Sequence, residues 1–161
     1  MQSAKDSFYI ALRDRLAALN PQRTVVVEGV TRPAILAREN EPTMSAGDQA
    51  NAFYLNWGPA LALDDSETPV MQIACEVTYW TSGSADGAGD RGRQLTTLDE
   101  ELLKICDPPR TALMDYSTSP ASELGRSVFW AAPQFKSMTD EQGRARRTAA
   151  LNVFFLAEDW R

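Results

Sequence analysis

The chain has 161 residues, the size of one ordinary domain, so we expect a single domain over residues 1–161 that needs no metal ion or disulfide to fold. Its net charge of −6 argues against a nucleic-acid binder with a basic patch, because binding to phosphates depends on clustered Lys and Arg. Histidine is absent, which excludes the commonest general base and the commonest zinc ligand.

The N-terminal segment predicts an amphipathic helix. Apolar residues recur at intervals of four, four and three from Phe8 to Leu19, and Pro21 ends the pattern, so we expect a helix from Ser7. The first residues lack the apolar stretch of a secretion signal, and no segment approaches the ~20 apolar residues of a membrane span. We therefore expect a cytoplasmic location.

Three segments with strand character follow. Thr24 to Glu28 is a β-branched run, and Val30 to Arg38 contains Pro33, which suits an edge strand or a strand with a bend. Phe53 to Leu63 predicts a strand that is interrupted near Gly58.

The clearest strand runs from Met71 to Trp80, with alternate residues on one face that we expect to be buried. Leu95, Leu98 and further apolar residues at spacings of three and four then predict a helix of about four turns from near Asp90 to Cys106. The alternate residues of the strand are Met71, Ile73, Cys75, Val77 and Tyr79.

The C-terminal part predicts a short apolar run at Ala112 to Tyr116, a strand at Ser127 to Phe135, a polar loop at Ser137 to Arg147 and a strand at Thr148 to Leu156. Most strands follow one another without an intervening helix, which favours a mainly antiparallel sheet. We therefore predict an α+β fold, a two-layer sandwich with helices packed on one face of the sheet.

Two polar segments are candidate interaction arms. Glu39 to Asn51 has no periodicity, and Thr81 to Gly89 consists of small residues before the expected N-cap, Asp90. Loops of this length in a compact domain often bind something. A tolerated insertion is the equally open alternative for Glu39 to Asn51.

Adjacent acidic residues offer the most obvious candidates for acid–base chemistry. Asp64 and Asp65 occupy a turn, whereas Asp99, Glu100 and Glu101 lie between the apolar positions of the expected helix. General acid and base catalysis needs two carboxyl groups in different environments that point at one substrate. Adjacent residues point in different directions, so we expect a solvated helix face instead.

Other catalytic patterns are incomplete. The segment Gly87 to Gly92 precedes a helix, where free N–H groups attract anions, but it lacks the ending of a P-loop and Asp90 would repel a phosphate. A serine nucleophile would need Lys5, Lys104 or Lys136 as its base, and no Ser-x-x-Lys signature is present.

The two cysteines, Cys75 and Cys106, fall in a buried strand and a helix, so we expect inert core thiols, with a disulfide or a nucleophile as the alternatives. We accordingly expect no catalytic, cofactor-binding or metal-ligating residues.

A basic cluster precedes the last strand. Arg144, Arg146 and Arg147 lie close together, with Lys136 before them. Such clusters are more often solvated patches or salt-bridge patches between subunits than anion sites.

Five segments together resemble the small tail-terminator and tail-completion proteins of long-tailed bacteriophages and prophages. The resemblance covers most of the chain as an order of elements, and its support for function is an analogy of fold. The segments are FYIALRDRLAAL, QIACEVTYW with its flexible loop, DRGRQLTTLDEELLKIC, FWAAPQF and RTAALNVFFLAED.

The resemblance implies a structural virion protein and not an enzyme. Such a protein forms a homo-oligomeric ring, commonly of six subunits, on the head-proximal end of the tail tube, stops tube polymerisation and joins the head connector. It implies the tail tube protein and head–tail connector proteins as partners, with no stable nucleic-acid binding and no membrane. It also implies the host cytoplasm during assembly and then the virion tail.

Two alternatives stay open. The first is another phage structural protein of the neck, tube or baseplate. The second is a small-molecule-binding or enzymatic α+β domain that uses a cavity between the sheet and the helices.

Overall fold

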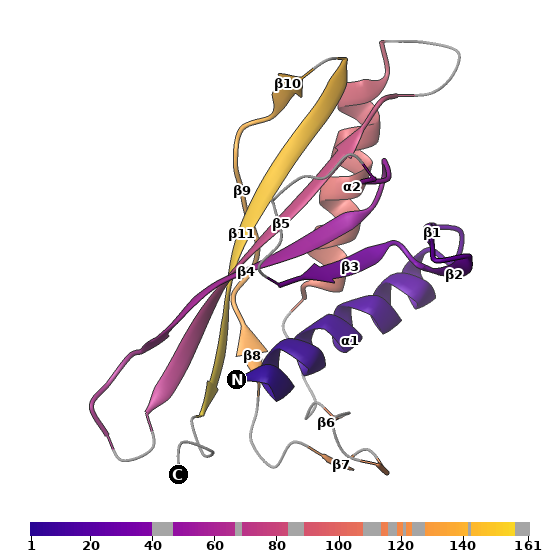
Figure 1. Ribbon diagram of the computed structural model, residues 1–161. Helices are drawn as coiled ribbons and strands as arrows, with labels where there is room; N and C mark the ends of the chain where they lie inside the picture. Colours follow the sequence, from indigo (N-terminus) through magenta and orange to yellow (C-terminus); the bar gives the residue numbers. More distant parts are fainter. Residues whose placement is uncertain are drawn as a thin grey trace.

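The computed structural model has two helices packed on one face of a mostly antiparallel sheet (Figure 1). It describes residues 1–39, 47–66, 69–83, 89–107, 128–141 and 143–156, together with the pairs 114–115, 119–120 and 122–123. The predicted α+β two-layer arrangement is confirmed.

The helices are α1 (Gln2–Leu19) and α2 (Arg91–Ile105). The strands, in chain order, are β1 (Thr24–Val27), β2 (Val30–Pro33), β3 (Ile35–Arg38), β4 (Phe53–Ala62), β5 (Val70–Thr81), β6 (Met114–Asp115), β7 (Ser122–Glu123), β8 (Phe129–Trp130), β9 (Gln134–Phe135), β10 (Thr139–Glu141) and β11 (Arg144–Leu156).

The main sheet has the strand order β10-β11-β5-β4-β3, and β8 and β9 also pair with β11. Its centre is the long antiparallel pair of β5 and β11, which runs from Thr81 opposite Ala145 to Val70 opposite Leu156. The β3–β4 pair is parallel, so the sheet is mixed. Two small hairpins, β1–β2 and β6–β7, lie outside this sheet.

The core lies between the sheet and the two helices. The five alternate residues predicted to face inward on β5 are all buried, which confirms the predicted face. Phe8, Leu12 and Leu16 of α1 are also fully buried, and the Phe8 ring meets the Trp130 ring edge-to-face with centroids 4.9 Å apart. The Trp130 indole donates a 2.9 Å hydrogen bond to the Cys106 carbonyl, which ties β8 to the end of α2.

Helix α1 begins at Gln2, earlier than the predicted start at Ser7. Its first turns also contribute to the core, since Ala4 and Ser7 are buried. These side chains are small, so they do not extend the pattern of large apolar residues that predicts the helix. The end is as predicted, with the Asn20 N–H bonded to the Leu16 carbonyl.

The predicted strand from Val30 to Arg38 is two strands, β2 and β3. They separate at Ala34, whose N–H donates to the Arg23 carbonyl. The preceding Pro33 has no N–H to donate to a sheet. The edge position is confirmed, because β3 ends the strand order of the main sheet.

The interruption predicted in β4 is also observed. The register between β4 and β5 shifts between Trp57 and Ala60, on either side of Gly58 and Pro59. A Cβ atom at Gly58 would lie 3.2 Å from the Cβ of Ala74, so glycine allows the two strands to approach closely at this bulge.

The C-terminal predictions need two corrections. The segment Ser127 to Phe135 contains two short strands, β8 and β9, which pair with different parts of β11. The expected loop Ser137 to Arg147 contains β10 and the start of β11, joined through Gly143 at φ 74°. Within the apolar run predicted at Ala112 to Tyr116, only β6 lies in the described residues.

Candidate functional site on the open face of the sheet

One face of the sheet is not covered by either helix (Figure 1). Because side chains alternate along a strand, Gln72, Ala74 and Glu76 of β5 point away from the core, and each is half-buried. Their cross-strand neighbours on β11 are Phe154, Asn152 and Ala150. We call this surface the open face.

The β4–β5 hairpin end of the open face is apolar. Leu61 pairs across from Gln72, which pairs in turn with Phe154, so these side chains form one row. The Leu63 N–H donates to the Val70 carbonyl, which starts the next row. We call these apolar side chains the arm patch: Leu61, Leu63, Val70, Phe129, Phe154 and Leu156.

The arm patch is exposed to an extent that is unusual for large apolar side chains. Leu61 is 57%, Leu63 52% and Phe129 44% exposed. The Phe129 ring stacks on the Phe154 ring, with centroids 5.1 Å apart and an interplanar angle of 16°. Contiguous exposed apolar surface of this kind marks interaction sites.

The hairpin tip carries Asp64 and Asp65, the first predicted carboxylate pair. The Asp64 carboxylate accepts hydrogen bonds from the Ser66 hydroxyl, the Ser66 N–H at 3.0 Å and the Val70 N–H at 3.2 Å. These bonds, the Ser66 hydroxyl first, lower the pKa of Asp64. Asp64 therefore stabilises the turn, and no described residue converges with it on a substrate position.

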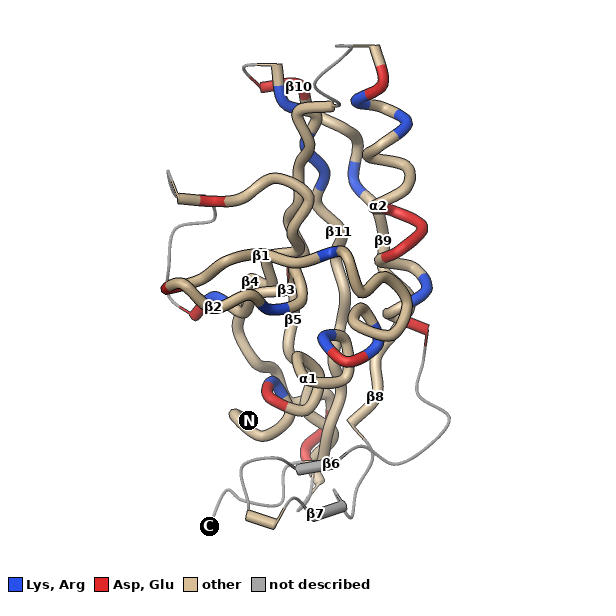
Figure 2. The backbone as a smooth tube through the Cα atoms, turned by 90° about the vertical axis from the view of Figure 1, so that its right-hand side faces the viewer, with Lys and Arg blue, Asp and Glu red and all other residues tan. Residues whose placement is uncertain are grey.

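The other end of the sheet holds the arginine cluster. The Arg144 guanidinium lies over the Trp80 ring, 4.5 Å from its centroid, and Arg146 pairs with Glu141 at 3.6 Å. Arg147 pairs with Asp99 at 3.1 Å on the helix side. The three arginines thus have three different partners within the chain, and they do not converge as an anion site. Figure 2 shows that basic residues of β11 and α2 share the β10 end of the molecule.

Lys136, named with this cluster, forms an ion pair with Glu76 on the open face. Lys5 pairs with Glu39 at 3.2 Å. Neither lysine contacts a serine hydroxyl among the described hydrogen bonds, and Lys104 is exposed on α2.

The expectation of a solvated face at Asp99, Glu100 and Glu101 is wrong for two of the three. Glu101 is only 8% exposed and accepts hydrogen bonds from Arg23 at 2.8 and 2.9 Å and from Asn20 at 2.8 Å. It fastens the segment after α1 to α2. Only Glu100 of the three is exposed.

Asp99 faces the sheet, where it pairs with Arg147 and accepts a hydrogen bond from the Tyr79 hydroxyl. Burial, and then the hydrogen bond to Asp99, raises the pKa of Tyr79. The helical spacing could have indicated that both acids face the core side of α2. Asp99 follows Leu95 by four positions and Glu101 follows Leu98 by three, and residues at these spacings lie on the same face of a helix.

The candidate arm Glu39 to Asn51 is anchored at its described end. Arg38 and Asp48 form an ion pair with side chains 7% and 5% exposed, and the Arg38 guanidinium lies 4.0 Å from the Tyr54 ring centroid. The Gln49 N–H donates to the Tyr54 hydroxyl at 2.6 Å, and its side chain bonds to the backbone of Val26.

Residues 47–49 therefore cover the β3–β4 corner of the open face and are held to it by these contacts. Residues 40–46 lie outside the described part of the chain. In the other candidate arm, Thr81 is buried and its hydroxyl donates to Gln94 at 2.8 Å, while residues 84–88 are not described.

The expected N-cap, Asp90, occupies the cap position of α2 without capping a backbone N–H through its side chain. Its carboxylate accepts a 3.2 Å hydrogen bond from the Gln94 side chain. Half of the glycine-rich segment Gly87 to Gly92 precedes Asp90, and residues 87–88 lie outside the described residues.

The two cysteines are free and buried, which confirms the expectation of core thiols. Burial raises the pKa of Cys75, and it raises the pKa of Cys106 to about 12. Because the thiolate is the nucleophile, neither thiol is activated for catalysis.

A depression of about 210 Å³ lies between the end of α1 and α2. It is between the helices and not between the sheet and the helices, where the small-molecule alternative expects a cavity. The Glu101 carboxylate in its wall is already bonded to Arg23. Its lining residues are Leu19, Asn20, Thr97, Glu100, Glu101 and Lys104.

Over the described residues, no cluster of three His, Cys, Asp or Glu side chains could bind a metal ion. Neither α1 nor α2, the helices in that part of the chain, has the length and apolar composition required to cross a bilayer. No protein-family model matches the sequence, and no curated protein matches it significantly.

Proposed function

We propose that the chain is a structural subunit of a phage or prophage tail, which forms a ring on the head-proximal end of the tail tube, ends tube polymerisation and prepares the tube for head joining. Its partners are further copies of itself, the tail tube protein and head–tail connector proteins. It assembles in the host cytoplasm and stays in the virion tail.

The observation that carries the proposal is the open face with its arm patch. The resemblance rests on an order of helices and strands, and the α+β two-layer fold predicted from that order is observed. Large apolar side chains on a projecting hairpin suit contact with another protein surface. In a ring, such a face can meet a different face of the next subunit.

The polar residues of the described part support a structural role. Asp99 and Glu101 are used in ion pairs between elements, and the thiols have raised pKa values. A net charge of −6 also suits a subunit around a DNA passage, because like charge prevents the DNA from binding.

The test deletes the coding sequence from the phage or prophage that carries it and measures tails by negative-stain imaging. We expect tails of excessive and variable length without heads, and restoration by the wild-type gene. Tails of normal length joined to heads would contradict the proposal.

A second readout separates the proposal from a neck, tube or baseplate role. A tagged copy of the chain, located by antibody on purified particles, is expected only at the head-proximal end of the tail tube. A label along the tube or at the distal end would favour one of the other structural roles.

A further inference from the structure

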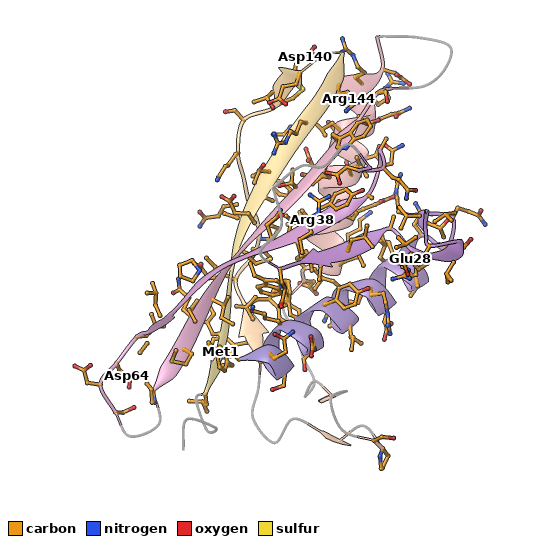
Figure 3. All side chains as sticks on the ribbon, viewed as in Figure 1. Met1, Glu28, Arg38, Asp64, Asp140 and Arg144 are labelled. Atoms are coloured by element: carbon orange, nitrogen blue, oxygen red, sulfur yellow. The ribbon has the colours of Figure 1, made fainter. Side chains whose placement is uncertain are left out.

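The distal half of β4 has a free strand edge. Strand β3 pairs with β4 only from Phe53 to Asn56, and beyond Asn56 this edge of β4 has no partner strand among the described residues. Figure 1 shows this part of β4 on the outer side of the projecting β4–β5 hairpin. Figure 3 shows Asp64 at the tip of the hairpin, at the opposite end of the sheet from Arg144. We call residues 60–63 the free edge.

The hydrogen bonds of the hairpin show which backbone groups point out from the free edge. The Leu63 N–H donates to the Val70 carbonyl, so these two residues form a hydrogen-bonded pair. In an antiparallel ladder such pairs alternate with pairs whose N–H and C=O groups point outward. Counting back from Leu63, Ala62 and Ala60 therefore direct their N–H and C=O groups away from β5. A further strand can bind these donors and acceptors.

The free edge lacks the usual protection of an edge strand. Natural edge strands commonly carry charged side chains, above all lysine, or proline. The residues from Ala60 to Leu63 are all alanine or leucine. Pro59 and the register shift beside it end the regular edge on one side, and Asp64, whose carboxylate binds the Val70 N–H, follows on the other. The free edge therefore fits a short apolar strand.

We propose that the free edge binds the free edge of a second copy as an antiparallel pair centred on Leu61. In this register the two outward-facing residues pair with each other: Ala60 of one copy with Ala62 of the other, each pair exchanging both N–H···O bonds. Leu61 meets Leu61 at the twofold axis, and Leu63 lies opposite Pro59. Every side chain that faces the other copy is apolar, so the strand is complementary to itself.

The contact joins the two sheets edge to edge. The twofold axis of an antiparallel pair is perpendicular to the sheet, so the open faces of both copies lie on the same side and their arm patches become neighbours. The contact is isologous and closes on itself, whereas a ring requires a heterologous contact. The inference therefore goes beyond the proposed function and does not depend on it.

The first test is a disulfide at the twofold axis. Leu61→Cys adds one exposed thiol to each chain, because Cys75 and Cys106 are buried. In a non-hydrogen-bonded antiparallel pair the Cα atoms are about 4.5 Å apart, which is within the range of a disulfide. Mild oxidation with diamide should therefore give a covalent dimer on a non-reducing gel.

Two matched controls carry the thiol at other exposed positions. Leu63→Cys replaces a side chain on the same face of the hairpin that is 52% exposed, against 57% for Leu61. The two copies of residue 63 would be about 13 Å apart along the paired strands. Leu103→Cys replaces a side chain of α2 that is 49% exposed. Neither control should form the covalent dimer as fast as Leu61→Cys.

The second test uses charges at position 61, which faces itself across the axis. Leu61→Lys and Leu61→Glu each place like charges opposite one another, so each variant alone should be monomeric in sedimentation velocity. An equal mixture should form one-to-one dimers, because opposite charges then face each other. The control variants Leu103→Lys and Leu103→Glu should each associate like the wild type.

The third test removes one backbone donor. Ala62→Pro deletes an outward-pointing N–H, and a proline at such a position is tolerated in an edge strand. This variant should keep the thermal unfolding midpoint within a few degrees but lose association, whereas Ala62→Val should keep both. Association by folded Ala62→Pro would overturn strand pairing in favour of a contact through the arm patch alone.

Three further results would overturn the inference: a wild type that stays monomeric at the highest concentration, equal cross-linking of Leu61→Cys and Leu63→Cys, or a mixture of the two charge variants without dimers. The tail-length experiment is independent of these results. Overlong tails without dimers would keep the proposed function and reject this contact. Dimers with normal tails would keep the contact and reject the proposed function.

Discussion

The two faces of β5 differ in what lies against them. On one face, Ile73, Val77 and Tyr79 are fully buried beneath the helices. On the other, Gln72 and Glu76 are half-buried and continue into the exposed arm patch. The same strand therefore builds the core with one set of alternate residues and contributes to the open face with the other.

This difference teaches that one strand can separate the residues that stabilise the fold from the residues that we propose for assembly. Burial of an apolar side chain contributes roughly 1.5–3 kcal/mol, so the helix-covered face determines folding. The half-buried and exposed side chains of the open face contribute less to folding. Substitutions on opposite faces should therefore have separate consequences.

The largest expected effect is on the helix-covered face. Val77→Asp places an unpaired charge in the core and should lower the free energy of unfolding by more than about 4 kcal/mol. Thr148→Asp on the open face, where Thr148 is half-buried near Lys136, is the matched control and should cost less than about 1 kcal/mol. Urea unfolding of both variants checks this prediction. Equal losses in the free energy of unfolding would show that the two faces do not differ in their contribution to stability.

A second prediction sharpens the comparison at the covered corner of the open face. Asp48→Ala leaves Arg38 buried without its carboxylate, so we expect a loss of about 3 kcal/mol in the free energy of unfolding. Asp65→Ala removes an exposed carboxylate and should change it by less than about 0.5 kcal/mol. Urea unfolding measures both variants. Equal free energies of unfolding for Asp48→Ala and Asp65→Ala would show that residues 47–49 do not anchor this corner.

A third prediction concerns two neighbouring acids of α2. Glu101→Gln weakens the contact with Arg23 and Asn20 and should cost about 2 kcal/mol, whereas Glu100→Gln on the solvent side should cost less than about 0.5 kcal/mol. Thermal unfolding measured by circular dichroism compares them. Similar midpoints for the two variants would restore the solvated-face interpretation of Glu101.

The smallest expected effect is that of pH on the buried thiols. Burial raises the pKa of Cys75 and Cys106 above the unfolded value of 9.0. Above pH 9 the unfolded chain therefore binds fewer protons than the folded chain, and stability falls as pH rises. Each thiol should contribute a loss of about 1 kcal/mol between pH 9 and pH 10.

Urea unfolding at several pH values tests the thiol prediction. The double variant Cys75→Ala and Cys106→Ala is less stable at every pH but should lose less stability between pH 9 and pH 10. A decline as steep as that of the wild type would show that other groups cause it. In the native wild type at pH 8, thiol reagents should react only after denaturant is added.

Much of the fold was predictable because hydrophobic periodicity is strong where elements are long. The helix at Leu95–Ile105 and the strand at Met71–Trp80 lie where the sequence predicts them. Short elements were harder. β8, β9 and β10 have two or three residues each, and pairing with β11, distant in sequence, determines where they form.

The candidate surface was less predictable, because it depends on register. Alternation places Leu61 and Phe154 on one face of their own strands, but only the observed pairing through Gln72 puts them side by side. The ion pairs of Glu101 and Asp48 were missed because a polar residue is ordinarily expected to face solvent, whereas here an arginine distant in sequence supplies the partner of each carboxylate.

The most direct test of the central claim is hydrogen–deuterium exchange of the wild type at low and at high concentration. The account predicts added protection on assembly in the β4–β5 hairpin, which carries the arm patch, with no change in α1. Added protection confined to α1 and the β1–β2 hairpin, with the open face unchanged, would contradict it.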